Sequence, residues 1–232
     1  MSGLLECRGV TKRFGSRLAL DHVDLTIEGG HIVGLLGPNG SGKTTLIKLL
    51  NGLLVPNEGE ILVQGGPVGV ESKKVISYLP DNTYLNHNKR VRDILDYFED
   101  WYADFDVIRA YDMLAKLGIN PNDKLKTMSK GTKEKVQLIL VMSRRAKLYV
   151  LDEPIAGVDP AARDYIMNTI LSNYDPEASI LIATHLIADV EQILDEVIFL
   201  QNGQIRIASS VEDIRMNQGK SVDTLFREVF RC

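Results

Sequence analysis

Cysteine is scarce in this chain: there are two, Cys7 and Cys232, at opposite ends of the sequence. Because they lie so far apart, they do not have the spacing of metal ligands, and we expect two reduced thiols, as in a cytosolic protein. Long apolar runs are also missing. A membrane-spanning helix needs ~20 apolar residues, and the richest run, residues 136–142, is far shorter. The N-terminal MSGLLECRGV lacks a charged segment followed by a long apolar stretch, so no signal peptide is predicted. We therefore expect any work at a membrane to go through a partner.

An excess of positive charge is absent too. The chain has 27 Lys and Arg against 31 Asp and Glu, a formal charge of −4, whereas proteins that bind nucleic acid usually carry a basic face. We therefore expect no nucleic-acid partner. One basic stretch does occur, and its plain interpretation is a solvated helix face. It consists of Lys124, Lys126, Lys130, Lys133, Lys135, Arg144 and Arg145.

The composition is that of an ordinary globular protein, with 232 residues, 44% hydrophobic and 25% charged. The length suits one α/β domain with a small insertion. We expect strands over residues 4–10, 18–27, 32–36, 61–63, 75–79, 148–151 and 180–183, and a hairpin of residues 197–200 and 204–207 around Asn-Gly. We expect helices over residues 43–50, 131–146 and 160–172, a mostly helical block over 91–117, and two short helices at the end. This alternation predicts a parallel-sheet α/β core with a helical insertion.

A glycine-rich loop follows the predicted buried strand at residues 32–36. Its sequence GPNGSGKT, from Gly37 to Thr44, fits the pattern G-x-x-x-x-G-K-[ST], and a helix is expected from Lys43. Glycines let successive backbone N–H groups turn towards phosphate oxygens, and the helix N-terminus adds partial positive charge. Lys43 can reach the β- and γ-phosphates, and the Thr44 hydroxyl can ligate Mg²⁺.

The alternative is a chance match, which would arise on the order of once per hundred chains. The strand before the loop and the helix after it make chance rarer still. We therefore interpret the loop as the site of a nucleoside triphosphate. Its expected contacts are Gly37, Pro38, Asn39, Gly40, Ser41, Gly42, Lys43, Thr44 and Thr45.

A second motif, KLYVLDEP, covers residues 147–154. An apolar strand delivers Asp152 at its C-terminal end, where ligands bind in open α/β sheets, and a carboxylate there can hold Mg²⁺. Glu153 follows and can polarise the attacking water as a general base. Taken alone, the pair could equally be a helix N-cap. Beside the phosphate loop, it favours a catalytic site.

These motifs and three shorter ones, in a fixed order, resemble the ABC ATPases, the ATP-binding subunits of ABC transporters, over nearly the whole chain. GPNGSGKTT resembles the Walker A motif, and LYVLDEP resembles Walker B with the catalytic Glu153. The resemblance implies that Phe14, in TKRFG, stacks on adenine. It also implies that Asp159, in AGVDP, belongs to the D-loop and that His185, in IATHL, senses the γ-phosphate.

Each of these three residues has a plainer alternative when the residues are taken alone. Phe14 could pack in the core. His185 could be an ordinary satisfied histidine at a strand end. Asp159 could cap the helix that begins at Pro160. The order of the motifs around the phosphate loop is what favours the resemblance.

MSKGT, residues 128–132, occupies the place of the family's signature motif LSGGQ. The resemblance implies that two chains sandwich two ATP molecules head to tail, and that Ser129 and Gly131 of each chain serve the other's γ-phosphate. Taken alone, Ser129 could simply cap the helix expected near Lys130. Lys130 and Thr132 depart from the family's usual glycine and glutamine, and Lys130 and Lys133 would add positive potential for ATP.

Asp81 is the second departure. It follows ISYLP, where the family usually has a glutamine that touches Mg²⁺ and the attacking water and couples to the membrane subunit. A carboxylate can still meet Mg²⁺. We therefore expect metal contacts from Thr44, Asp81 and Asp152.

The fold implied by the resemblance is a P-loop NTPase core with a mainly parallel sheet, an N-terminal antiparallel β subdomain and an inserted helical subdomain. All would lie within one ATP-binding domain over residues 1–232, with the helical subdomain at about residues 86–145. The implied activity is ATP hydrolysis with ATP and Mg²⁺ as cofactors. The implied partners are a membrane-spanning transporter subunit and a second ATP-binding subunit, in a homo- or heterodimer. The implied location is cytoplasmic, on the inner face of the membrane.

Around Asp81 the chain also resembles subunits of some bacterial export and antibiotic-resistance systems. By family analogy, the short tail after about Gly203, without the large regulatory domain that some sugar importers carry, favours export over import. Three alternatives stay open from the sequence. One is a regulatory subunit with weak turnover. The second is a soluble ABC ATPase outside transport, although those carry a coiled-coil insertion or two fused ATPase domains. The third is a small-molecule kinase or a GTPase, although no N-K-x-D guanine motif is present.

Overall fold

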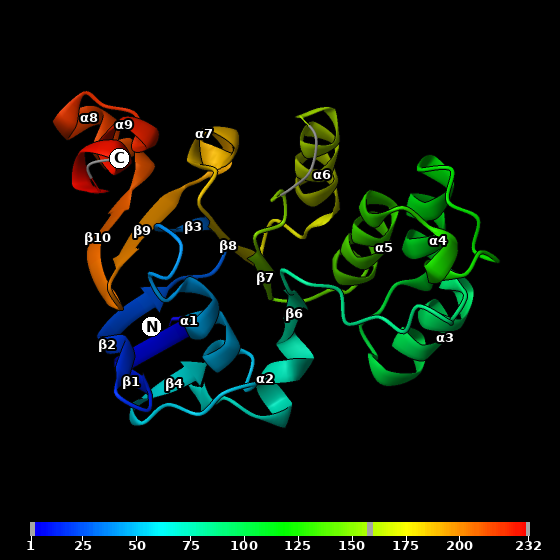
Figure 1. The fold of residues 1–232 in the computed structure, drawn as a ribbon, viewed down its shortest axis with the longest axis horizontal. Helices are drawn as coiled ribbons and strands as arrows, with labels where there is room; N and C mark the ends of the chain where they lie inside the picture. Colours follow the sequence, from blue (N-terminus) through cyan, green and yellow to red (C-terminus); the bar gives the residue numbers. More distant parts are fainter. Residues whose placement is uncertain (1–2, 157–159, 231–232) are drawn as a thin grey trace.

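The computed structural model describes residues 3–156 and 160–230. Two sheets form its frame (Figure 1). The first is antiparallel, in the order β2-β1-β4-β5, and confirms the expected N-terminal β part. Its strands are β1 (Leu5–Phe14), β2 (Arg17–Ile27), β4 (Glu58–Val63) and β5 (Gly66–Pro67).

The second sheet has six strands in the order β10-β9-β3-β8-β7-β6, and all its pairs are parallel except that of β10 with β9. This confirms the mainly parallel core. Its strands are β3 (Ile32–Leu36), β6 (Ile76–Leu79), β7 (Leu148–Asp152), β8 (Ser179–Thr184), β9 (Glu196–Gln201) and β10 (Gln204–Ser210).

Both faces of the six-stranded sheet are covered, which is why its central strands read as continuous apolar runs. Successive side chains of β7 alternate between two hydrophobic clusters. Tyr149 and Leu151 belong to the cluster shared with the helices of residues 91–230. Leu148 and Val150 belong to the cluster shared with α1 (Lys43–Leu50) and the antiparallel sheet. The sheet therefore lies between two cores, and its strand ends are free to carry polar groups.

The helices surround this frame, and α3, α4 and α5 gather at the side of the molecule away from the antiparallel sheet (Figure 1). The expected helical block at 91–117 is confirmed as two helices, α3 and α4. Among the described residues, none of the helices is long and apolar enough to cross a membrane. The helices are α1 (Lys43–Leu50), α2 (Val70–Val75), α3 (Val91–Trp101), α4 (Val107–Lys116), α5 (Lys130–Met142), α6 (Pro160–Asn173), α7 (Ile187–Val190), α8 (Val211–Gln218) and α9 (Val222–Phe230), with 3₁₀ turns at Leu125–Thr127 and Glu191–Ile193.

Two boundaries differ from the prediction. Helix α5 was expected to run to Ala146 but ends at Met142, because the chain after Ser143 turns to pair with the segment before α4. Val75 was expected to open a strand but is the last residue of α2, which the sequence did not predict. Six residues are too few for helical periodicity to be recognised.

The interpretation of the basic stretch as a solvated helix face is wrong for Arg144. Its side chain is 3% exposed. The guanidinium donates to both oxygens of Asp104, at 3.1 Å each, and to the backbone carbonyl of Lys74 at 2.9 Å. It also lies 4.0 Å from the ring centre of Tyr102. Lys124, Lys126, Lys130 and Arg145 are exposed, as expected.

The Asn-Gly hairpin between β9 and β10 is confirmed. Asn202 and Gly203 have φ values of 51° and 78°. Positive φ at both central residues is the signature of a type I′ turn, whose twist matches that of the flanking strands. This turn lies against the phosphate loop, because Gly203 is hydrogen-bonded to Ser41.

Candidate functional site

The loop from Gly37 to Thr44 lies between β3 and α1, in the predicted setting. Gly42, the residue before α1, has φ 115°. A Cβ there would lie 2.7 Å from the carbonyl oxygen of Ala19, so only glycine fits. The β9–β10 turn supports the loop, because the N–H of Gly203 donates to the carbonyl of Ser41 at 2.9 Å. That support joins residues too far apart in sequence to be predicted.

The loop lines a cavity of about 460 Å³. Phe14, at the end of β1, is 47% exposed beside it, so the alternative that Phe14 packs in the core is wrong. Arg17 pairs with Phe14 across the turn between β1 and β2, and its guanidinium lies 3.8 Å from where a Cβ on Gly40 would stand. Arg17 was not predicted from the sequence, although its place opposite Phe14 was a usable signal. The cavity is lined by Phe14, Arg17, Ala19, Asn39, Gly40, Ser41, Gly42, Lys43, Thr44, Thr45, Asp81 and Glu153.

Lys43 is buried, with 6% of its surface exposed. Its ammonium donates to the carbonyl of Gly37 at 2.7 Å and lies 3.6 Å from Oε1 of Glu153. Burial lowers the pKa of Lys43, and the carboxylates of Glu153 and Asp152 partly offset that shift. The cation is therefore held beside the loop by groups that incoming phosphates can replace.

Glu153 follows β7 in the left-handed backbone region, with φ 51°. Such strain in a residue other than glycine is concentrated at functional sites. The Thr184 hydroxyl donates to Oε2 at 3.0 Å, and Nδ1 of His185 lies 3.0 Å from both carboxylate oxygens. Because an ionised carboxylate only accepts, Nδ1 is the donor. His185 is thus a direct partner of Glu153. The alternative that Asp152 and Glu153 form a helix N-cap is wrong, because α6 begins at Pro160.

Asp152 ends β7 beneath the loop, and it is 1% exposed. Its Oδ1 accepts from the Thr44 hydroxyl at 3.4 Å, whereas its buried Oδ2 has no hydrogen-bond partner among the described residues. Burial, reinforced by Asp81, raises the pKa of Asp152 to about 6. The Ser41 hydroxyl is also buried without a partner within the described part of the chain. Orphaned oxygens beside Thr44 are the donor set that Mg²⁺ prefers, so the residues present fit that ion.

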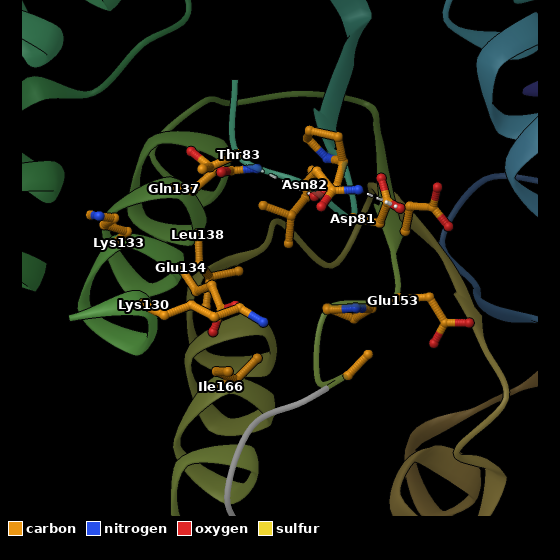
Figure 2. A pocket seen from close by; sticks show the side chains of 15 residues that line it. Asp81, Asn82, Thr83, Lys130, Lys133, Glu134, Gln137, Leu138, Glu153 and Ile166 are labelled. Carbon is orange, nitrogen blue, oxygen red and sulfur yellow. Dashed lines mark hydrogen bonds and ion pairs between the residues drawn. The ribbon is translucent and has the colours of Figure 1, made fainter. Parts of the chain in front are cut away.

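Asp81 follows β6 and is exposed. Its Oδ2 accepts from the amide of Asn82 at 2.9 Å. It lines the phosphate-loop cavity together with Thr44 and Glu153. It also lines a smaller cavity of about 150 Å³ between the 79–83 segment and α5, where Asp152, Glu153 and Gln137 are further lining residues (Figure 2). Gln137 was not predicted as a site residue from the sequence.

Ser129 and Gly131 are not among the residues that line the phosphate-loop cavity, and Ser129 lines a different cavity with Asn120 and Thr132. Ser129 is exposed and caps α5, because its Oγ accepts from the N–H of Thr132 at 3.1 Å. The capping role is therefore present, as predicted. Lys130 is exposed and lies 3.7 Å from Glu134. Asp159, expected in the D-loop, lies outside the described residues.

Comparison with known proteins points in one direction. The family model described as "ABC transporter" matches residues 20–156. A curated relative from Bacillus subtilis (strain 168), the uncharacterized ABC transporter ATP-binding protein YhaQ, is 32% identical and covers 93% of this chain and 74% of its own. The SkfA peptide export ATP-binding protein SkfE, from the same organism, is 30% identical and covers 98% and 96%.

Two further matches agree with these. The Nod factor export ATP-binding protein I of Rhizobium sp. (strain N33) is 31% identical and covers 86% of this chain and 68% of its own. A solved structure described as the ATP binding subunit of an ABC transporter superposes with a TM-score of 0.88 at 28% identity, covering 98% and 99%. With a family model over more than half of its length and relatives above 30% identity, the chain belongs to the ABC transporter family, as an ATP-binding subunit that hydrolyses ATP.

Proposed function

We propose that ATP binds as its Mg²⁺ complex in the phosphate-loop cavity, with the adenine against Phe14 and the phosphates along residues 37–45. One observation carries this proposal: Lys43, Asp152 and Glu153 converge on the loop, where Oδ2 of Asp152 and the Ser41 hydroxyl are buried without partners among the described residues. Such groups call for a charged ligand. Arg17, beside Gly40, adds a further cation for the phosphates.

The metal would be held by Thr44 and Asp152, with Asp81, which also lines the cavity, as a further ligand. A Mg²⁺ ion there supplies positive charge against the phosphate oxygens. Lys43 would leave its contact with Gly37 for the γ-phosphate. Glu153 would then accept a proton from the attacking water, while His185 keeps the carboxylate oriented through its Nδ1–H. The charge that develops on the phosphate would be stabilised by Lys43 and by donors from a second subunit.

That second subunit is proposed because Ser129 lies away from its own chain's phosphate-loop cavity. Two copies, or this chain and a related one, would close head to tail, so that Ser129 and Gly131 of each reach the other's ATP. The N-terminus of α5 is then an anion site for the neighbour's γ-phosphate.

Closure would move a separate membrane-spanning subunit, which keeps this chain on the inner, cytoplasmic face of the membrane. The helical subdomain at about residues 86–145 supplies the docking surface together with the segment at Asp81. Asp81 supports this arrangement because it lines both the phosphate-loop cavity and a groove of about 470 Å³ shared with Lys73, Tyr84 and Tyr102. One loop therefore touches both the nucleotide and the docking surface. Two relatives are named for export, so outward transport is the direction that we propose.

Glu153→Gln tests the catalytic proposal. The amide keeps the shape but cannot accept the proton, so ATP binding should persist while turnover falls by about 10²- to 10⁴-fold, the usual contribution of a general base. ATP should then trap a species of twice the mass, measured by light scattering. ATPase activity near that of the wild type in this variant would overturn the role of Glu153.

A further inference from the structure

Gln137 is a buried amide in the most apolar part of α5. It is 3% exposed, between Val136 and Leu138, in a stretch that is otherwise hydrophobic up to Met142. A neutral amide is costly to bury unless it is hydrogen-bonded, and a leucine or methionine would fill the same space without that cost. The presence of an amide here therefore requires a specific polar partner.

The partner is the loop that carries Asp81. Nε2 of Gln137 donates to the backbone carbonyl of Pro80 at 3.3 Å, directly before Asp81 (Figure 2). Pro80 follows the last residue of β6. The bond therefore ties α5 to the point where the chain leaves the sheet, and it limits how far the loop can move.

A second bond joins the same two elements one helical turn further on. The Ser77 hydroxyl, 1% exposed in the middle of β6, donates to the carbonyl of Val141 at 2.9 Å. This bond fixes the helix against the strand but does not touch the loop. The two bonds separate two effects, since Ser77 secures the packing of α5 on β6 and Gln137 secures the loop.

The loop needs this hydrogen bond because it places the Asp81 carboxylate near two other carboxylates. Asp81, Asp152 and Glu153 all line the small cavity beside Gln137 (Figure 2). Asp81 is already exposed, and repulsion from the other two carboxylates favours a loop in which it moves further from them. The Gln137–Pro80 bond opposes that motion and keeps the carboxylate near the place where a divalent cation would lie.

We infer that Gln137 is a positioning residue for ATP hydrolysis, holding the Asp81 loop against α5 so that Asp81 stands ready for the metal. This inference rests on the proposed role of Asp81 beside Mg²⁺. Gln137 also joins the two halves of the mechanism, because α5 carries Ser129 at its N-terminus, two turns away. A shift of this helix would therefore move the Asp81 loop of the same chain.

Gln137→Met tests the inference, with Ser77→Ala as the matched control. Methionine keeps the length of the side chain and removes the donor. In the full chain without metal or nucleotide, amide hydrogen exchange of residues 81–83 should become about threefold to tenfold faster, the size expected from losing one neutral hydrogen bond. Ser77→Ala should lower the melting temperature and leave that exchange unchanged.

The ATPase assay supplies the second readout. In Gln137→Met the Mg²⁺ concentration for half-maximal activity should rise by a similar factor, with kcat at saturating Mg²⁺ little changed. The rise should vanish in an Asp81→Asn background, because Gln137 acts through Asp81. If Gln137→Met does not fold, Gln137→Leu replaces it, since a leucine side chain also lacks the donor.

Three results would overturn the inference: unchanged exchange and Mg²⁺ dependence in the Gln137 variant, an equal shift in the Asp81→Asn background, or the same shift from Ser77→Ala. The proposed function fails separately. If Asp81→Asn alone leaves the Mg²⁺ dependence unchanged, the metal role of Asp81 is wrong, whereas the exchange measurement still decides whether Gln137 holds the loop.

Discussion

Glu153 and Asp152 are adjacent in sequence, yet the fold gives them different surroundings. Asp152 is the last residue of a central strand, and its carboxyl is buried beneath the phosphate loop. Glu153 has a positive φ, and its own side chain points towards Thr184 and His185. In the proposed mechanism, one carboxyl would hold the cation and the other would accept the proton, which is the division of roles that hydrolysis requires.

The stability of the metal-free protein should depend on pH through Asp152. The folded chain keeps this proton up to about pH 6, whereas an unfolded chain releases it near 3.8. Between these values the folded state binds the extra proton, so the contribution of Asp152 to stability falls as pH rises and is level above the folded pKa. From pH 5 to pH 7 the wild type should therefore lose about 1 kcal/mol relative to Asp152→Asn.

Urea unfolding in a chelator at pH 5, 6 and 7 measures this difference for the two proteins. The comparison cancels the titrating groups that do not interact with Asp152. A difference between wild type and variant that stays constant over this range would show that the Asp152 carboxyl is ionised throughout.

At the scale of elements, polar contacts fix α5 along its length, among them the bond from the Ser77 hydroxyl to the carbonyl of Val141. Ser129 caps its start, Gln137 meets the Asp81 loop, and Arg144 lies just beyond its end. Arg144 donates hydrogen bonds to Asp104 and to a backbone carbonyl at the end of α2, so it joins the helical block to the sheet. An apolar helix can slide on an apolar surface, whereas these contacts allow one register only.

Arg144→Met should destabilise the protein by about 3–5 kcal/mol, because it leaves the partly buried Asp104 carboxylate without its charged partner and the carbonyl of Lys74 without its donor. Arg145 is the matched control. Its side chain is 72% exposed and pairs with Asp106 at 3.0 Å, so Arg145→Met should cost at most about 1 kcal/mol. Thermal or urea unfolding of both variants measures the contrast. Equal losses would mean that the buried contacts of Arg144 contribute no more than a surface ion pair.

At the scale of the whole molecule, the phosphate loop and the start of α5 lie at separate sites of one chain. A head-to-tail homodimer would bring them together between chains, and this arrangement predicts complementation. Lys43→Ala disables a chain's own phosphate loop, and Ser129→Arg blocks the donor offered to the neighbour. Each variant alone should be inactive.

A mixture of the two variants should regain activity, because a mixed dimer has one site that combines the intact loop of one chain with the intact Ser129 of the other. With random pairing, up to about a quarter of wild-type ATPase activity should return. The measurement is ATPase activity across mixing ratios at fixed total protein. Two silent variants that stay silent when mixed would argue against a homodimer that shares its sites.

The sequence by itself determined the features that are written in contiguous residues. Strand β3, the loop from Gly37 to Thr44, helix α1 and the Asp152–Glu153 pair were all predictable, because strand, turn and helix signals act over a few neighbouring residues. The same holds for the Asn-Gly hairpin. Where elements were short, as with α2, or where an apolar run ended without a glycine or proline, as after Met142, the local signal was too weak to fix the boundary.

Only the tertiary structure decided which polar side chains are buried and what they contact. Arg144 belonged to a basic stretch in the sequence, and its burial depends on Asp104 and Tyr102. In the sequence, Gln137 is a polar residue within an apolar run, and only the fold brings it within hydrogen-bond distance of Pro80. The physical reason is that a hydrogen bond or an ion pair depends on distance in space, and the packing of helices on the sheet sets that distance between residues that are remote along the chain.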